Sequence, residues 1–316
     1  MVSAVGRWSI VCAVGVALLS ARAGAQRDLE VLPVQGDVFV LAGPAGNTTV
    51  QIGPEGPLLV DIQPAALSDR VLEAVEALTP RPIRHIILTS ASDSSPAGGA
   101  GRLAEAGRYV RVIDSIDPRG LDTRASIIAH VNVLEQMTSG GVPSDSWPTD
   151  TYFTSEWALF SNGEAVRLLH VPAAHTDGDT IVFFRRSDVV STGAIYDAAA
   201  YPRFDPGDGG SIDGIIEALT LVLDLTIAGE GQQGGTVVVP GRGRLSDETD
   251  VANYRDMVTI IRDRIRALIA QGRSLDQVKA ARPTFDYDAL YGSTEGDWTA
   301  ERFVEAIYRD LSGGSR

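Results

Sequence analysis

The sequence predicts an α/β fold of two similar halves, each a short β-meander followed by helices. Runs of β-branched residues separated by turn residues open each half, and apolar residues at helical spacing follow them. Because the apolar face of a sheet must be covered, we expect two sheets packed face to face with helices outside, an αββα sandwich of four layers. The chain has 316 residues, 44% of them hydrophobic, which suffices for a core of this kind.

The first half should open with an antiparallel meander and continue into helices. Its expected strands are 37–42, 48–52, 58–62, 83–89 and 109–113. A helix is expected over 67–78, with Ser68 as its N-cap and Pro80 beyond its end. A short helix near Leu103 and a longer one over about 122–137 complete this half.

The second half repeats this order. Its expected strands are 158–160, 165–171, 181–184, 189–192 and 236–239, and its expected helices are 212–227, 251–271 and 299–311. Asn162-Gly163 is typical of the two-residue turn of a hairpin. After Gln26 there is no long linker, low-complexity segment or internal repeat, so we expect one continuous domain over 26–316.

The charge of the chain excludes one class of partner. It contains 27 Lys and Arg against 41 Asp and Glu, a formal net charge of −14, and Lys279 is its only lysine. Nucleic acids and anionic membranes are bound mainly through basic surfaces. We therefore expect no nucleic-acid partner, and the expected partner is an unidentified small molecule or protein.

The first 25 residues have the three parts of a secretory signal peptide. Arg7 precedes an apolar run over 10–19, and small residues end the segment at Ala23-Gly24-Ala25. Cleavage is expected before Gln26, which would place the protein outside the cytoplasm, secreted or periplasmic. An uncleaved membrane anchor is the alternative, but the apolar run is shorter than the ~20 residues of a spanning helix, so we expect no stable anchor. Cys12 lies in this segment, so the mature chain would have no cysteine.

Six segments resemble the metallo-β-lactamase fold superfamily, in the order in which they occur there. They are Asn47-Thr48, LLVDIQ at 58–63, IRHIILTS at 83–90, PAAHTDGDTIVFF at 172–184, STGAIYD at 191–197 and VVPGRG at 238–243. The late segment GRSLDQVKAARPT at 272–284 is similar to the secreted metallo-hydrolase branch. The resemblance implies two αβ halves packed sheet to sheet, a hydrolase ancestry, and zinc as the cofactor of the family.

The resemblance also implies seven metal-ligand positions: a His-x-His-x-Asp-His loop after a central strand, a further His, a bridging Asp and a late His. In this chain they fall on Ser90, Ser92, Ser94, Ser95, His175, Ala194 and Arg242. Only His175 keeps the residue type of the family. Because zinc needs three or four N, O or S donors, we expect neither metal nor any other cofactor here.

Arg242 differs from the other substitutions because it brings a charge. A guanidinium stays protonated and has no lone pair to give a metal. Arg242 therefore either stands in for the missing cation, paired with an acid or an anionic ligand, or is a solvated arginine in a turn.

The four histidines have competing interpretations. His175 is either a general base, a lone metal ligand, or a polar residue held by hydrogen bonds as a relic of the site. His170 at a strand end, His130 on a helix and His85 within an apolar strand are expected to be structural.

The serines of the 90–95 loop raise a second chemistry, since a hydroxyl beside an imidazole can become a nucleophile. The chain has no Gly-x-Ser-x-Gly elbow to support it. Asp93 would need a register shift to reach the aspartate position, and Asp177 and Asp179 flank Gly178 in what is expected to be a turn. Candidates for a pocket wall follow Ala194, and these are Tyr196, Asp197, Tyr201, Phe204, Asp205 and Asp208.

The function expected from these residues is that of an exported pseudoenzyme, which binds a ligand or partner without catalysis after losing its dinuclear zinc site. The alternative is a hydrolase that works in the same cleft with His175 and a serine, or with one unconventional metal. Metal content and turnover of esters, lactams and phosphodiesters would separate the two.

Overall fold

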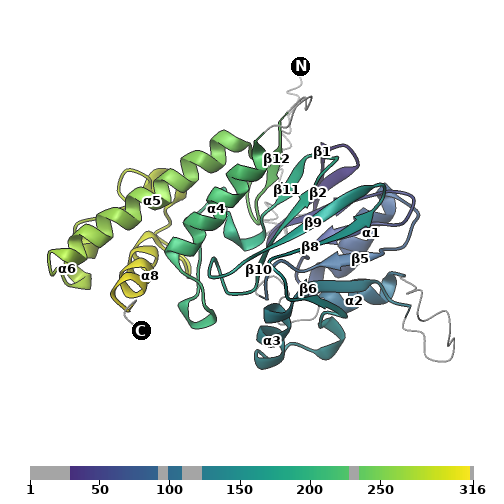
Figure 1. Ribbon diagram of the computed structural model, residues 1–316, viewed down its shortest axis with the longest axis horizontal. Coiled ribbons are helices and arrows are strands. Elements are labelled where there is room, and N and C mark those ends of the chain that lie inside the picture. Colours follow the sequence, from purple (N-terminus) through teal and green to yellow (C-terminus); the bar gives the residue numbers. More distant parts are fainter. Residues whose placement is uncertain (1–28, 92–98, 109–122, 228–234, 314–316) are drawn as a thin grey trace, which may run out of the picture.

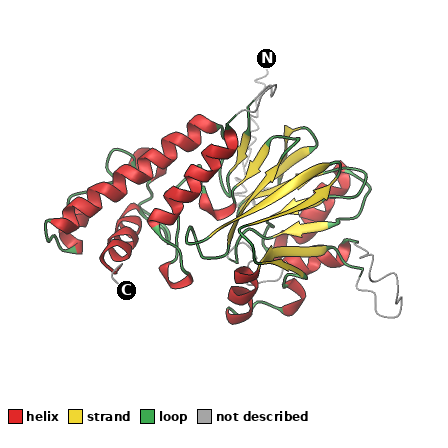
Figure 2. Ribbon diagram, in the orientation of Figure 1, coloured by secondary structure: helices red, strands yellow, loops and turns green. Residues whose placement is uncertain are grey.

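The computed structural model describes residues 29–91, 99–108, 123–227 and 235–313. Two sheets pack against each other and helices cover their outer faces (Figures 1 and 2). The expected signal peptide, the strand expected over 109–113, and Ser92, Asp93, Ser94 and Ser95 lie outside the described residues. Among the described helices, none is both long and apolar enough to span a membrane.

The first sheet has seven strands, in chain order from β1 to β7. They are β1 (Glu30–Gln35), β2 (Val38–Gly43), β3 (Gly46–Gln51), β4 (Leu58–Val60), β5 (His85–Ile87), β6 (Ser126–His130) and β7 (Asp150–Tyr152). The pairings from β1 to β4 are antiparallel, which confirms the expected meander, and those from β4 to β7 are parallel. The outer face is covered by α1 (Ser68–Leu78), α2 (Gly99–Ala106) and α3 (Val131–Ser139).

The second sheet has five strands, in the order β12-β11-β10-β9-β8. They are β8 (Glu156–Ser161), β9 (Glu164–Val171), β10 (Asp179–Phe184), β11 (Val189–Ser191) and β12 (Val237–Val239). Asn162 and Gly163 join β8 to β9 with positive φ angles of 50° and 83°, as expected for the two-residue turn. The helices that follow are α4 (Ile212–Thr226), α5 (Glu248–Ala270), α6 (Leu275–Ala280), α7 (Asp288–Tyr291) and α8 (Ala300–Gly313).

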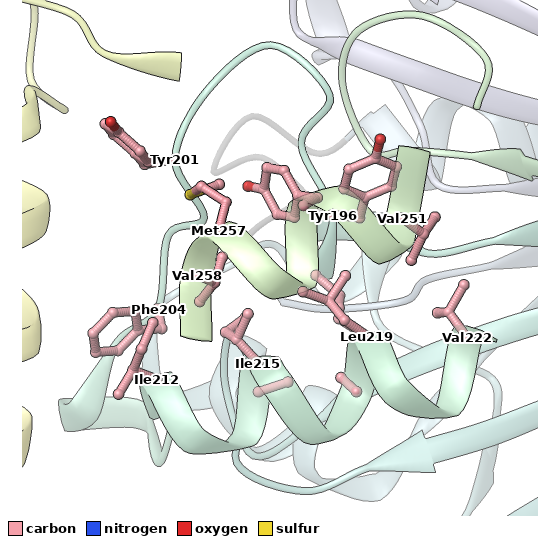
Figure 3. Close-up of a cluster of buried hydrophobic side chains, with 14 of the residues drawn as sticks. Tyr196, Tyr201, Phe204, Ile212, Ile215, Leu219, Val222, Val251, Met257 and Val258 are labelled. Atoms are coloured by element: carbon pink, nitrogen blue, oxygen red, sulfur yellow. The ribbon is translucent and has the colours of Figure 1, made fainter. Parts of the chain in front are cut away.

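Three hydrophobic cores separate four layers. The central core lies between the sheets, where Val40 and Leu58 of the first sheet meet Leu168 and Val182 of the second. A second core joins the first sheet to α1, α2 and α3. The third joins the second sheet to α4, α5 and α8, and Figure 3 shows side chains of α4 packed beneath α5. The αββα sandwich expected from the sequence is confirmed.

Two local expectations are wrong. The helix expected over 122–137 is instead strand β6 followed by α3, and the two meet at His130, which ends the strand and caps the helix through its Nδ1. Ser68 is the first residue of α1 rather than its N-cap, because a 3-10 turn over Ala65–Leu67 runs directly into the helix.

Candidate functional site

A cavity of about 270 Å³ opens where the two halves of the sandwich meet. It is lined by Ala45, His175, Ala194, Tyr196, Asp197, Ala200, Arg203, Gly241, Arg242 and Trp298. Three of the seven positions that the resemblance assigns to metal ligands, His175, Ala194 and Arg242, therefore share one cavity. They come from the β9–β10 loop, the segment after β11 and the turn after β12.

The turn that carries Arg242 is held on both sides by backbone hydrogen bonds. On one side Asn47 donates its N–H to the Gly241 carbonyl at 2.8 Å, and its Nδ2 donates to the carbonyls of Pro240 and Gly243, both at 2.9 Å. On the other side the Gly241 N–H donates to the Tyr196 carbonyl, and the Ala198 N–H donates to the Arg242 carbonyl. The backbone of Arg242 is thus fixed before any ligand binds.

Ala194 is brought to the cavity by a close approach of two strand ends. Gly193 has a φ of 52°, and a Cβ atom at this position would overlap the Thr89 hydroxyl. Thr89 is itself anchored, since its N–H and hydroxyl both donate to the Asp61 carboxylate at 2.8 Å. Because only glycine tolerates this backbone angle and this close contact, the segment after β11 can lie against Thr89, which directly precedes the 90–95 loop.

His175 has a defined tautomer. Its Nδ1 lies 3.0 Å from the Arg203 carbonyl oxygen, and because a carbonyl only accepts, Nδ1 carries the proton. In the neutral ring the lone pair is then on Nε2, the atom that a base or a metal ligand would use. His175 is partly buried at the cavity wall.

Arg242 and Arg203 differ in how their charges are balanced. Arg203 forms a bidentate pair with Asp297, at 2.9 and 3.1 Å, and its guanidinium lies 5.2 Å from the centre of the Trp298 ring. The guanidinium of Arg242 donates to the Ala45 carbonyl at 3.0 Å, and no carboxylate of the described residues lies within 4 Å of it. Arg242 is the less neutralised of the two cations.

Asp197 is the acidic group of the cavity. Its Oδ1 accepts the Ala199 N–H at 2.8 Å, and burial raises the pKa of its carboxyl, partly opposed by that hydrogen bond and by Arg242. Asp197 and Arg242 face each other as a parallel β-bridge, yet their side chains form no ion pair within 4 Å. A carboxyl with a perturbed pKa in a cleft is a recognised sign of a functional site.

The donors of this cavity do not fit a dinuclear zinc site. His175 is its only imidazole, and Arg242 adds a permanent positive charge where the resemblance implies a ligand. Within the described residues no group of three or more His, Cys, Asp or Glu side chains is arranged to hold a metal. The three further ligand positions that the resemblance implies lie outside the described residues and are Ser92, Ser94 and Ser95, and serine hydroxyls are poor zinc donors.

The other candidates fall into structural roles. Ser90 is fully buried directly after Thr89 and does not line the cavity. His85 shares a 2.6 Å hydrogen bond with Ser126, and His170 donates from Nε2 to the Asp177 carbonyl. The rings of His130 and His170 stack at 3.6 Å.

The remaining wall candidates divide between the cavity and the core. Tyr196 and Asp197 line the cavity, while Tyr201 and Phe204 belong to the core that joins the second sheet to α4, α5 and α8. Asp205 caps a short 3-10 helix, and Asp208 accepts the Asp177 N–H through its carbonyl.

Sequence reasoning missed two residues that line the cavity and one contact that supports it. Arg203 and Trp298 carry no local motif, and they meet only because the segment before α8 returns to the cavity. Asn47 was part of a family-like dipeptide, but its contact with the turn at 240–243 spans almost 200 residues and leaves no local pattern.

No protein-family model matches the chain, and no curated protein matches it. Solved structures do match. The chain is similar to a metallo-beta-lactamase from Pontibacter korlensis, with 13% identity over 73% of this chain and 99% of that chain and a TM-score of 0.54. It is also similar to the stereoselective inverting sec-alkylsulfatase Pisa1 from Pseudomonas sp., with 13% identity over 89% of this chain and a TM-score of 0.64. The match spans half the length of that alkylsulfatase.

Proposed function

We propose, from the premise that this chain has the metallo-β-lactamase fold, that it is an exported pseudoenzyme that uses the ancestral cleft for binding without metal-dependent hydrolysis. The observation that supports this most is the cavity shared by His175, Ala194 and Arg242. The resemblance implies a metal ligand at each of these three positions. His175 supplies an imidazole, whereas Ala194 supplies only a methyl group and Arg242 a guanidinium. The fold retains a concave site, and the residues in it suit a ligand better than a zinc ion.

Electrostatics supports the same proposal. A zinc ion and a guanidinium would both be positive, and two cations in one small cavity repel each other. The guanidinium cannot relieve that repulsion by losing its proton. Arg242 can instead supply the positive charge that a metal supplies in relatives, and it does so without an open coordination site for activating water.

Zinc titration tests the proposal directly. Calorimetric titration of the native protein with zinc should give no stoichiometric binding, and melting temperatures with EDTA and with added zinc should agree. Ligand binding to the native state raises stability by mass action, so a metal site would separate the two melting curves. Tight stoichiometric binding, or a melting shift of several degrees, would overturn the proposal.

A restored site provides the positive control for that titration. Six substitutions return the implied ligand set, and these are Ser90→His, Ser92→His, Ser94→Asp, Ser95→His, Ala194→Asp and Arg242→His. The sixfold variant should bind about two zinc ions, as the dinuclear sites of the family do, whereas Ser90→His alone should bind almost none because two donors do not close a zinc shell. Failure of the sixfold variant would mean that the cleft has lost the ancestral geometry.

One observation favours the alternative hydrolase. The tautomer of His175 leaves the lone pair on Nε2, which is what a general base requires. Turnover of an ester, lactam and phosphodiester panel that is lost in His175→Asn and unaffected by EDTA would support this alternative over the binding role.

A further inference from the structure

The cavity holds an arginine and an aspartate that do not neutralise each other, and this arrangement points to a ligand that carries both complementary groups. Resting on the proposed binding function, we infer that the ligand is a small aryl hydroxycarboxylate: an anion with a hydroxyl donor and one apolar ring. The chemistry comes from Arg242, Asp197 and the two aromatic walls formed by Tyr196 and Trp298.

The carboxylate is assigned to Arg242. Its guanidinium donates one hydrogen bond to the Ala45 carbonyl and has no carboxylate partner within 4 Å in the described residues. A planar fork with unused donors binds carboxylates by two parallel charge-assisted hydrogen bonds. Because the whole chain carries a formal charge of −14, an anion will stay in the cavity only where a local cation outweighs the general repulsion.

The hydroxyl is assigned to Asp197. The Asp197 carboxyl accepts the Ala199 N–H, and no arginine or lysine of the described residues lies within 4 Å of it. Asp197 and Arg242 pair through their backbones as a parallel bridge and both line the cavity, so the two side chains start from neighbouring positions on its wall. A ligand whose hydroxyl is adjacent to its carboxylate can therefore reach both, and the hydroxyl donates to the group that would otherwise repel an anion.

The ring is assigned to the walls formed by Tyr196 and Trp298. The Tyr196 hydroxyl is engaged by Ser246 Oγ at 2.9 Å, and the Trp298 indole N–H donates to the Tyr201 carbonyl at 3.1 Å. With their polar atoms already satisfied, both residues offer ring carbon to the cavity. The cavity volume of about 270 Å³ suits a ligand of one ring and a short polar group.

Mandelate is the probe, because it combines a carboxylate, an adjacent hydroxyl and a phenyl ring. Calorimetric titrations would compare mandelate with phenylacetate, which lacks the hydroxyl, and with methyl mandelate, which lacks the charge. The native protein should bind mandelate at least tenfold more tightly than either of the others. Added salt should weaken mandelate binding more than methyl mandelate binding.

Two variants and a matched control assign the groups. Arg242→Gln should weaken the affinity for mandelate at least tenfold. Asp197→Asn should reduce the difference in affinity between mandelate and phenylacetate. Arg244→Gln removes an equal charge two residues away, where the arginine pairs with Asp250 outside the cavity, and should bind as the native protein does. Melting temperatures check that the variants fold. Arg242→Lys keeps the charge but not the planar guanidinium, and its affinity for mandelate should lie between those of the native protein and Arg242→Gln.

The outcomes separate this inference from the proposal on which it rests. Equal binding of methyl mandelate and mandelate, native affinity in Arg242→Gln, or no mandelate binding by the native protein would overturn the assigned ligand class while leaving metal independence intact. Stoichiometric zinc binding would overturn the proposed function itself.

Discussion

Asn47 should determine whether the cavity keeps its shape, and removing its side chain is the sharpest test of that view. The Nδ2 group donates to the carbonyls of Pro240 and Gly243, and Asn47 is only 8% exposed, so water cannot easily replace it. A hydrogen bond contributes about 0.5–1.5 kcal/mol net, and an unsatisfied buried carbonyl costs more. Asn47→Ala should therefore lower the free energy of unfolding by about 2–3 kcal/mol.

Urea unfolding of Asn47→Ala and of two comparison variants measures this loss in the free energy of unfolding. Asn132→Ala is the matched control, because Asn132 donates one part-buried hydrogen bond, to the Asp177 carbonyl, and should lose only about 1 kcal/mol. Asn47→Asp replaces the donor by an acceptor and buries a carboxyl, so its pKa should rise and the variant should become less stable as pH increases above the ordinary carboxyl pKa of about 4. A loss below about 0.5 kcal/mol in Asn47→Ala would refute the argument that this residue holds the turn.

Three further predictions concern other parts of the chain. Burial lowers the pKa of His130 from 6.5 to about 4, with the His170 ring as a second cause, so His130 should be neutral when folded and stability should fall as pH drops from about 6.5 towards 4. His130→Asn, which keeps a good N-cap residue, should flatten that part of the melting-temperature profile. Gly193→Ala should cost about 2–4 kcal/mol through its left-handed backbone and the overlap with Thr89, whereas Gly272→Ala, also at positive φ but with open space around it, should show only the backbone cost in urea unfolding. Intact-mass measurement of exported protein should give a chain that begins at Gln26, and a mature species that retains Met1 would contradict the expected leader.

Most of the fold could be predicted because its signals are local. The Asn-Gly turn, the meander of the first sheet and the amphipathic helices α4, α5 and α8 each follow from a few neighbouring residues. Strand β6 was missed because its apolar run continues into the apolar positions of α3, and the combined stretch imitates one long helix. Strand β1 was missed because Pro33 interrupts it, which a strand tolerates at the edge of a sheet.

The site could be predicted only in part, for a related reason. His175, Ala194 and Arg242 were found because a family resemblance aligned their segments, whatever distance separates them in sequence. Arg203, Trp298 and the contacts of Asn47 depend on which chain segments meet in space, and no periodicity or spacing encodes that. The ion pair of Arg203 with Asp297 likewise joins residues 94 positions apart.

The cavity has a floor and a wall of different construction. Its floor, around Ala194 and Gly241, is built from segments fixed by backbone hydrogen bonds and, at Gly193 and Gly241, by contacts too tight for a side chain. Its wall at Trp298 and Asp297 belongs to the segment leading into α8, held by one exposed ion pair, one indole hydrogen bond and ring contacts. Sequence changes in that segment would therefore alter the wall at small energetic cost, while the backbone that carries Arg242 stays in place. Variants of this scaffold would then share one fixed arginine and differ in one replaceable wall.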